Sequence, residues 1–355
     1  MKILALTYFD PASVILSHRN MMRDAGHDFR LASVRAYTTR QEGADWLLEK
    51  LSDSAVLPDG RFKLSFDYVT GQQADLKSLH EFAETADVVQ FHPGIGEGSG
   101  DWASHTGLVD QSFLDKELGE VIHRLKVFRA IEAKIIVYFI HGSVNTWANL
   151  KLHKDNRYNH FLAASTLDYA TELNATYLPP LINPGHDWPM APLRGDYEPL
   201  TIAHTPSDRD ACHTETFMKL SFEAGCLPVV KDKISHDEVI ALKAKCNAGF
   251  DHLRGAFSTN TLEHAALGMV PLVGLKRNYL DRFLDIGGSL PPWQELCKNG
   301  IETEDDLVVA MRTLESNPEL TRRLQIYAAK WWADNFSRGS LTNRLLAFYE
   351  KELSL

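Results

Sequence analysis

Short apolar runs alternate along the chain with longer stretches in which apolar residues recur every three or four positions. The first run covers residues 2–8, and a helical pattern follows over residues 14–25. Gly26 comes next, and glycine suits the left-handed turn that ends many helices. Residues 29–34 then form a second apolar run. Because a strand, a helix and a second strand follow one another closely, this pattern predicts a βαβ unit.

The same alternation continues through the first half of the chain. A helix is predicted at residues 113–130, and a loop at residues 9–13 joins the first strand to the first helix. This loop lacks the GxGxxG pattern, so the sequence gives no direct support for dinucleotide binding there. Strands that alternate with helices are typical of a parallel sheet covered by helices. Further strands are predicted at residues 86–92, 133–140, 161–166 and 176–178.

A proline-rich stretch separates this half from the next. Its prolines include Pro179, Pro180, Pro184, Pro189, Pro192 and Pro199. Such a composition marks an irregular linker between domains. Beyond it the alternation restarts, which predicts a second α/β domain followed by a helical tail. Strands are predicted at residues 200–204, 227–230 and 270–274, and helices at residues 214–225, 236–246, 305–316, 319–335 and 340–350.

Length and composition agree with a folded protein of two domains. The chain has 355 residues, of which 44% are apolar and 24% are charged. The net charge is −10, and no long basic run is present. Both facts disfavour a general nucleic-acid-binding protein, which needs a basic face.

Neither a membrane span nor an export signal is predicted. No window approaches the roughly 18 uninterrupted apolar residues of a transmembrane helix. The first apolar run is interrupted by Asp10 and Pro11, too early for a signal peptide. The cysteines lack the CxxC spacing of zinc sites. They are Cys212, Cys226, Cys246 and Cys297. We therefore expect a cytoplasmic protein that binds no metal.

The strongest candidate for a ligand site lies between residues 249 and 274. A turn of small polar residues opens a predicted helix there, formed by Ser258, Thr259, Asn260 and Thr261. A helix N-terminus presents unpaired N–H groups and the positive end of the helix dipole, which suits a phosphate. Glu263, one turn further on, can accept hydrogen bonds from sugar hydroxyls. This pattern predicts a nucleotide diphosphate site, and the alternative is an ordinary βαβ crossover with a solvated glutamate.

Two histidines end separate predicted strands of the first half. His92 and His141 are each followed by loop residues that include glycine. In an open α/β sheet, ligands bind beyond the carboxyl ends of the strands. Both histidines are therefore candidate site residues, and the alternative for each is a solvated or capping role at the start of a loop.

Five segments resemble motifs of the GT-B glycosyltransferases, in the same order along the chain. They are ADVVQFHPG, IVYFIHGS, ASTLDYATELNATYLPPLINP, IAHTPSDR and GAFSTNTLEHAALGMVPLV. The last one resembles the signature of the retaining, family-4-like (group 1) members. The resemblance implies two Rossmann-like βαβ domains that face each other across a cleft, with C-terminal helices packing back on the N-terminal domain. It implies an acceptor domain at residues 1–185, a donor domain at residues 186–335 and a returning helix at residues 336–355.

The resemblance also implies roles for the candidate residues. Glu263 would hold the ribose of a nucleotide-sugar donor, and His92 would act as a catalytic residue beside the transferred sugar. Asp10 and His141 would lie on the acceptor side. The donor would be a UDP- or GDP-sugar, bound as a substrate, with no other cofactor and no metal. Backbone amides would meet the phosphates at Thr259, Asn260 and Thr261, next to Ser258.

Two departures from the family pattern change this picture. Gly255 stands where the first glutamate of the E-x7-E motif is expected, and Cys212 stands at the position of a phosphate-binding lysine. Arg209 is predicted to replace that lysine as a catalytic phosphate clamp, because a guanidinium matches phosphate oxygens. The alternative for Arg209 is a surface salt bridge. Lys219 and Arg254 are weaker candidates for the same role.

The resulting prediction is a glycosyltransferase that moves a sugar to an acceptor hydroxyl, with retention and without a metal. The acceptor classes left open are a surface glycan, a lipid-linked precursor and a hydroxymethylated DNA base, as in viral enzymes of this fold. Two alternatives remain. One is a degenerate GT-B protein that binds a nucleotide without turnover. The other is a nucleotide-sugar 2-epimerase, which needs more cleft carboxylates than the sequence suggests.

Overall fold

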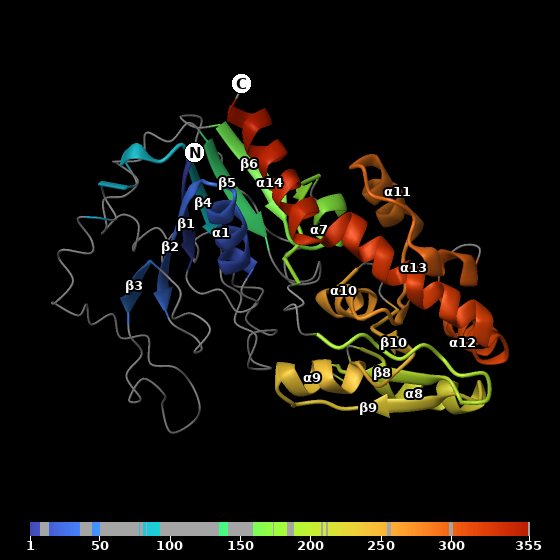
Figure 1. Ribbon diagram of the computed structural model, residues 1–355. Helices are drawn as coiled ribbons and strands as arrows, with labels where there is room; N and C mark the ends of the chain where they lie inside the picture. Colours follow the sequence, from blue (N-terminus) through green and yellow to red (C-terminus); the bar gives the residue numbers. More distant parts are fainter. Residues whose placement is uncertain are drawn as a thin grey trace. The chain divides into compact units, whose positions relative to one another are not determined.

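The computed structural model divides into two compact units (Figure 1). The first unit comprises Met1–Ser165, Glu172–Pro180 and Thr342–Leu355, and the second comprises Thr166–Thr171 and Leu181–Leu341. The structure describes residues 1–7, 14–35, 45–49, 78, 81–82, 84–92, 135–140, 159–172, 174–182, 188–206, 209–210, 212–253, 257–297 and 301–353.

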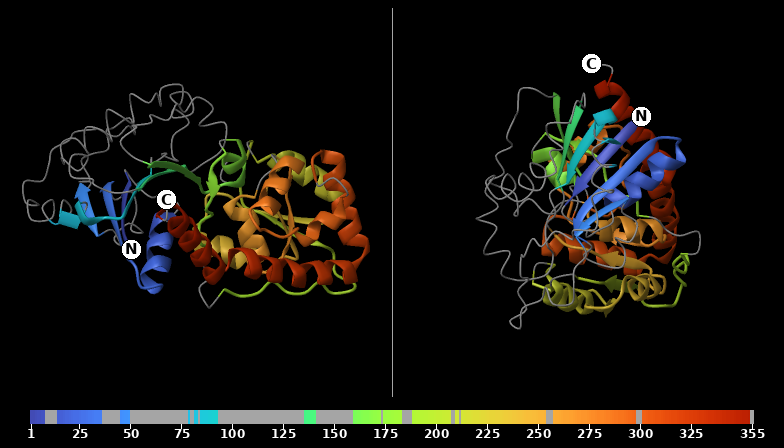
Figure 2. Two further views of the ribbon diagram at one scale, coloured as in Figure 1. Left: turned by 90° about the horizontal axis from the view of Figure 1, so that it is seen from above. Right: turned by 90° about the vertical axis from the view of Figure 1, so that its left-hand side faces the viewer.

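In the described part of the first unit, seven strands form a parallel sheet in the order β3-β2-β1-β4-β5-β6-β7. Ile3 in β1 lies opposite Phe29 in β2 on one side and opposite Val88 in β4 on the other. All three side chains are buried, which explains the continuous apolar runs of these strands. The strands, coloured blue to green, lie side by side in both views of Figure 2. They are β1 Lys2–Thr7, β2 Asp28–Arg35, β3 Trp46–Glu49, β4 Val88–His92, β5 Ile135–Ile140, β6 Asn159–Ala164 and β7 Thr176–Tyr177.

Two helices from opposite ends of the sequence belong to this unit. Helix α1 (Val14–Asp24) buries Val14, His18 and Met21, which recur at the spacing of one helix face. Helix α14 (Arg338–Leu353) lies in the first unit from Thr342 onward. Its Tyr349 hydroxyl accepts a hydrogen bond from the Gln90 side chain of β4, and both residues are buried. The last helix is thereby joined to a central strand of the sheet.

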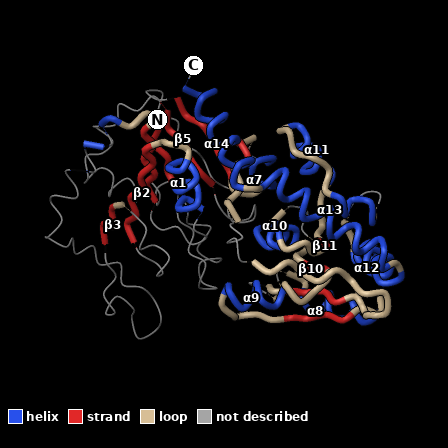
Figure 3. Tube along the Cα trace, viewed as in Figure 1, coloured by secondary structure: helices blue, strands red, loops and turns tan. Residues whose placement is uncertain are grey.

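The second unit holds a four-stranded parallel sheet in the order β11-β10-β8-β9 within its described residues. Ala248 in β10 pairs with both Ile202 in β8 and Val270 in β11, and all three are fully buried. Figure 3 shows these strands alternating with helices. The strands are β8 Thr201–His204, β9 Leu227–Val230, β10 Ala248–Phe250 and β11 Val270–Leu272. The helices are α7 Leu167–Glu172, α8 Thr214–Glu223, α9 His236–Lys243, α10 Thr259–Ala266, α11 Arg277–Asp285, α12 Glu304–Ser316, α13 Pro318–Phe336 and a 3₁₀ helix, Pro292–Leu296.

The predicted α/β class and the parallel sheets are confirmed in both units. Most predicted elements that fall on described residues begin and end within a few residues of the observed bounds. Strands β3 and β10, helix α11 and the 3₁₀ helix Pro292–Leu296 were not predicted. The helix predicted at residues 113–130 lies outside the described residues.

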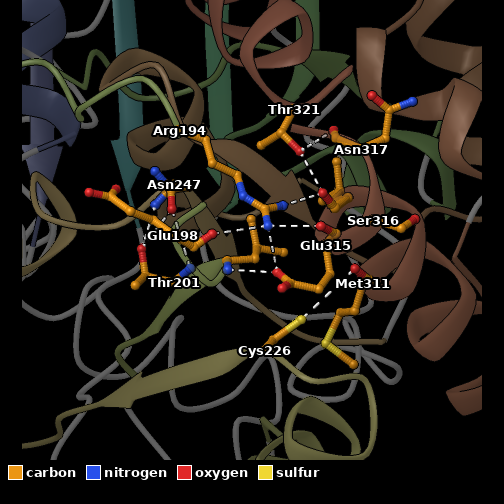
Figure 4. Close-up of polar contacts among 12 residues, drawn as sticks. Arg194, Glu198, Thr201, Cys226, Asn247, Met311, Glu315, Ser316, Asn317 and Thr321 are labelled. Atoms are coloured by element: carbon orange, nitrogen blue, oxygen red, sulfur yellow. Dashed lines mark hydrogen bonds and ion pairs between the residues drawn. The ribbon is translucent and has the colours of Figure 1, made fainter. Parts of the chain in front are cut away.

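The proline-rich segment before β8 has no helix or strand at residues 188–200, as predicted, yet it is firmly attached to the second unit. The buried Arg194 side chain donates to the carbonyl oxygens of Leu314 and Glu315, at the end of α12 (Figure 4). It also pairs with the Glu315 carboxylate at 2.8 Å. The same carboxylate accepts a hydrogen bond of 2.7 Å from the Leu200 amide. Arg194 therefore caps the C-terminus of α12, and Glu315 joins the same end of α12 to Leu200, directly before β8.

Within the described residues, the helices are too short or too polar to cross a membrane.

Candidate functional site

Helix α10 begins at the predicted turn, and its own side chains close its N-terminus. Ser258 has extended backbone angles and is the N-cap residue. Its hydroxyl accepts hydrogen bonds from the amides of Asn260 at 3.0 Å and Thr261 at 3.4 Å. The Thr259 amide forms no hydrogen bond within the described part of the chain. Two of the three amides predicted to meet phosphate are thus paired with Ser258, and the third has no partner among the described residues.

Asp251 places a carboxylate beside this helix start. It follows β10 directly and is buried. One carboxylate oxygen accepts from the Ser258 hydroxyl and from the Thr261 hydroxyl at 2.5 Å, and the other accepts from the Asn260 side-chain amide at 3.4 Å. Burial raises the pKa of Asp251, but the nearby His252 and the hydrogen bonds from Ser258 and Thr261 lower it to about 2. A negative charge therefore occupies the positive end of the α10 dipole.

Glu263 lies one turn into α10, and its carboxylate is held on both oxygens. The side chain is only 8% exposed. Oε1 lies 2.9 Å from Nε2 of His236, and Oε2 lies 2.5 Å from Nζ of Lys243. Burial raises the pKa of Glu263, but the hydrogen bond from His236 and the charge of Lys243 lower it below its ordinary value. Glu263 is therefore ionised at neutral pH although it is buried.

Lys243 connects two of the predicted ligand-binding residues of α10, Asn260 and Glu263. It is the last residue of α9, and its side chain has no exposed surface. Besides its contact with Glu263, Nζ donates to the side-chain oxygen of Asn260. That oxygen also accepts from the Thr205 hydroxyl at 3.3 Å, from the loop after β8. One ammonium group thus orients side chains from both the first and the second turn of α10.

His236 forms the more open side of the same cluster. It is the first residue of α9, directly after the Ser235 N-cap, and its side chain is 37% exposed. Its ring centroid lies 5.9 Å from that of Trp188. The Glu263 carboxylate is consequently closed on the Lys243 side and borders solvent on the His236 side.

His264 supports the cluster from within the core. Its ring is fully buried against Gly249, where an added Cβ atom would lie 2.4 Å from the imidazole. Burial, together with the charge of Lys243, holds the pKa of His264 well below its ordinary value. Neither ring nitrogen has a hydrogen-bond partner among the described residues. A neutral His264 therefore packs β10 against α10, which requires glycine at position 249.

Arg209 lies on the surface of the second unit and is already paired. Its guanidinium contacts Glu215 at 2.5 Å and Asp232 at 3.7 Å, and the side chain is 41% exposed. The salt bridge named as the alternative is thus present, while the phosphate-clamp role stays a prediction. Lys219 is exposed and pairs with Glu223.

The remaining predicted residues belong to the first unit or to undescribed segments. His92 ends β4, with its backbone in register with Thr7 of β1. The backbone of His92 is thus at the carboxyl end of a central strand, as predicted. Asp10, His141, Arg254 and Gly255 lie outside the described residues.

Sequence reasoning missed Asp251, His236 and Lys243. The signal for Lys243 was weak but present, because it follows Ile240 by three positions and therefore lies on the buried face of α9. Its partners lie 17 and 20 residues away in the chain. The spacing of residues within α9 therefore could not predict the contacts of Lys243 with Asn260 and Glu263, which belong to another helix.

No cluster of three or more histidine, cysteine, aspartate or glutamate side chains that could hold a metal ion is found among the described residues. The two acidic residues of the site, Asp251 and Glu263, accept hydrogen bonds from neighbouring side chains.

The sequence matches no protein-family model, and no curated protein matches it. Solved structures do match over the whole chain. The catalytic domain of starch synthase IV from Arabidopsis thaliana, bound to ADP and acarbose, has a TM-score of 0.58 at 11% identity, with 100% of each chain covered. An alpha-glucosyltransferase in complex with UDP-glucose and DNA containing an abasic site has a TM-score of 0.56 at 9% identity, with 98% of each chain covered.

Sucrose-phosphate synthase from Thermosynechococcus elongatus has a TM-score of 0.51 at 9% identity, with 100% of each chain covered. These neighbours are GT-B glycosyltransferases. At such identities the likeness establishes the fold, so the chain has the GT-B fold that the sequence motifs predicted.

Proposed function

We propose that this protein is a glycosyltransferase and that α10 binds the nucleotide of a nucleotide-sugar donor. The observation that carries the proposal is Glu263, an ionised carboxylate held on two sides within the second unit of a GT-B fold. Structures with this fold have been determined with UDP, UDP-glucose and ADP bound. These ligands support a nucleotide-sugar as the substrate, with a UDP- or GDP-sugar as our first choice.

Glu263 would hold the ribose. A carboxylate has about four acceptor positions, and Lys243 and His236 use two of them. The remaining positions can accept hydrogen bonds from the two ribose hydroxyls. Hydrogen bonds to a charged group contribute roughly 1.5–3 kcal/mol, so loss of the carboxylate should weaken nucleotide binding at least tenfold.

The diphosphate would meet fewer free amides than a typical helix N-terminus offers. Only the Thr259 amide is open among the three predicted ones in the described structure, and Asp251 adds a nearby negative charge. We therefore propose that Arg209 supplies part of the compensating positive charge without a metal ion. In this proposal, His92 acts beside the transferred sugar, Asp10 and His141 serve the acceptor, and transfer proceeds with retention.

The acceptor is a hydroxyl of a glycan, a lipid-linked precursor or a modified DNA base. Alpha-glucosyltransferase structures contain DNA, and two of them contain a 13-mer DNA with a HMU base. The net charge of −10 opposes DNA binding, because duplex DNA is densely negative. A carbohydrate acceptor is therefore the first to test, and a duplex with hydroxymethylated bases is the second.

The test begins with a thermal-shift screen of the purified protein against UDP, GDP, ADP and their common sugars. A ligand at about a hundred times its Kd adds roughly 2.7 kcal/mol to stability, which is a clear rise in Tm. We expect one base to give this rise and Glu263→Ala to lose it. The ligand that binds is then assayed for release of nucleoside diphosphate with each acceptor class. A Tm that none of the nucleotides raises would contradict the proposal.

A second candidate is a degenerate GT-B protein that binds a nucleotide but transfers no sugar. The departures at Gly255 and Cys212, together with the pairing of two amides by Ser258, favour it. The same assay separates the two functions. A nucleotide-dependent rise in Tm without turnover of any nucleotide-sugar would identify the binder, whereas turnover that Glu263→Ala abolishes would identify the enzyme.

A further inference from the structure

We propose that Lys243 is a positioning residue of the donor site, which holds the Glu263 carboxylate and the Asn260 side chain in the orientation that the nucleotide meets. This inference rests on the nucleotide-binding role proposed for α10. Lys243 contacts both residues, through Oε2 of Glu263 at 2.5 Å and through the side-chain oxygen of Asn260.

Lys243 cannot itself reach a ligand. Its side chain has no exposed surface, whereas the side chain of its neighbour His236 is 37% exposed. Any effect of the ammonium group on a nucleotide must therefore pass through the residues that it touches. Of these, Glu263 is the one with acceptor positions left for a ribose.

Helix α9 holds the Glu263 carboxylate from both of its ends. His236 is its first residue and Lys243 its last, and residues seven positions apart lie on the same face of a helix. One face of α9 therefore supplies both partners of Glu263, one to each oxygen. No other ionisable side chain in the described structure forms a hydrogen bond or an ion pair with this carboxylate.

Stability alone does not account for a charged residue at this position. Transfer of an ammonium group out of water is unfavourable, and replacement of a buried ion pair by apolar side chains is often neutral or stabilising. The neighbouring position Ile240 shows that this face of α9 otherwise packs as an ordinary apolar core. An apolar side chain could not keep the Glu263 carboxylate ionised or hold its orientation. The ammonium group of Lys243 does both.

The test compares the binding of ribonucleoside diphosphates and their 2′-deoxy counterparts by calorimetry, starting with UDP and 2′-deoxy-UDP and extending to the GDP and ADP pairs. The ratio of the two Kd values reports the hydrogen bond to the ribose and is insensitive to a general loss of stability. The variants are Lys243→Met, which keeps the length of the side chain without its charge, and Lys243→Arg, which keeps the charge. Leu307→Ala, a buried change in α12, is the matched control for lost stability.

We expect the wild type to favour the ribonucleotide about tenfold or more, the size of one hydrogen bond to a charged group. Lys243→Met should lower this preference to below about threefold. The preference of this variant should fall further as the pH is lowered, because Glu263 is easier to protonate without the charge of Lys243. Lys243→Arg should restore most of the preference, and Leu307→Ala should leave it at the wild-type value. An unchanged ratio and pH profile in Lys243→Met would show that the lysine serves stability alone and would overturn the inference.

Two further outcomes separate this inference from the proposed function. If the wild type binds ribonucleotides and 2′-deoxyribonucleotides equally well, the inference about Lys243 is overturned, but the proposed sugar transfer is not. A wild type that binds none of the nucleotides would overturn both. If Lys243→Met does not fold, the double variant Lys243→Met/Glu263→Gln removes both charges. Its ratio should equal that of Glu263→Gln alone, and a difference between the two would contradict an action of Lys243 through Glu263.

Discussion

Asp251 carries a full negative charge in the interior of the second unit, and its hydrogen bonds stabilise that charge. The hydroxyls of Ser258 and Thr261 both donate to it, and they belong to the first turn of α10. The carboxylate thus links the end of β10 to the start of α10. Because its pKa is lowered, Asp251 stabilises the folded protein more when it is ionised than when it is protonated.

The stability of the protein should depend on this carboxylate in acid. The pKa of Asp251 is lowered from 3.8 to about 2, so its contribution is complete above about pH 4 and is lost as the pH falls toward 2. A shift of this size corresponds to roughly 2 kcal/mol at neutral pH. We expect Asp251→Asn to lower the free energy of unfolding by about that amount at neutral pH, as measured by urea unfolding.

The difference between the wild type and Asp251→Asn should shrink as the pH falls below about 4. Asp281→Asn, which removes an exposed partner of Arg277, serves as the control and should show little pH-dependent difference from the wild type. A difference for Asp251→Asn that stays constant down to the lowest pH measured would show that the charge does not matter.

Arg209 permits a test of the phosphate clamp. In the structure its guanidinium pairs with Glu215 and Asp232. Both carboxylates raise the pKa of Arg209, and the hydrogen bond that Arg209 donates to Glu215 has the largest effect. Arg209→Ala should raise the Kd for UDP about tenfold and leave the Kd for uridine unchanged, because only UDP carries the diphosphate. Lys219→Ala, which removes another exposed cation, should change neither constant. Equal UDP affinity in wild type and Arg209→Ala would leave Arg209 as a surface salt bridge.

At the scale of elements, side chains of α9 and α10 contact each other directly. His236 and Lys243 at the two ends of α9 meet Glu263 in the middle of α10. The capping box of α9, formed by Ser235 and Glu238, sets where that helix begins and hence where His236 lies. The start of α9 consequently belongs to the proposed donor site.

The segment before β8 is attached to α12 by one buried arginine. Removal of one partner of a buried ion pair is strongly destabilising, so Arg194→Met should lower the free energy of unfolding by about 3–5 kcal/mol. Arg322→Ala is the matched control, because Arg322 binds Asp196 of the same segment at a more exposed position. We expect the control to lose less than about 1 kcal/mol. The free energy of unfolding of both variants is measured by urea unfolding. Similar losses for Arg194→Met and Arg322→Ala would show that the burial of Arg194 does not increase its contribution to stability.

At the scale of the whole molecule, the order of elements along the chain is enough to predict the α/β class, whereas the GT-B fold was predicted from the resemblance of the sequence motifs. Parallel sheets need a helix between successive strands, and each such unit leaves a strong local pattern of apolar residues. The strands from Lys2–Thr7 to Val270–Leu272 were therefore largely predictable. Trp46–Glu49 and Ala248–Phe250 were not predicted, although other strands of two to four residues were.

The candidate site was predicted less completely than the fold. Glu263 and the turn at Ser258 stood out because a helix start, its cap and its first acid lie next to one another in the chain. The pairing of Asn260 and Thr261 amides with Ser258 follows from the same local rule, although the sequence motif suggested a phosphate there. Asp251 was missed because its partners are recognisable only when β10 and α10 are placed side by side.

The sequence by itself determined most of the strands and helices, the irregular segment before β8 and the position of Glu263, because these depend on short-range periodicity and capping. The tertiary structure alone decided the surroundings of that glutamate. Lys243 and His236 reach it from another helix, and Asp251 reaches the start of α10 from the end of a strand. Charge state and orientation depend on burial and on partners distant in the chain, and both exist only once the chain has folded.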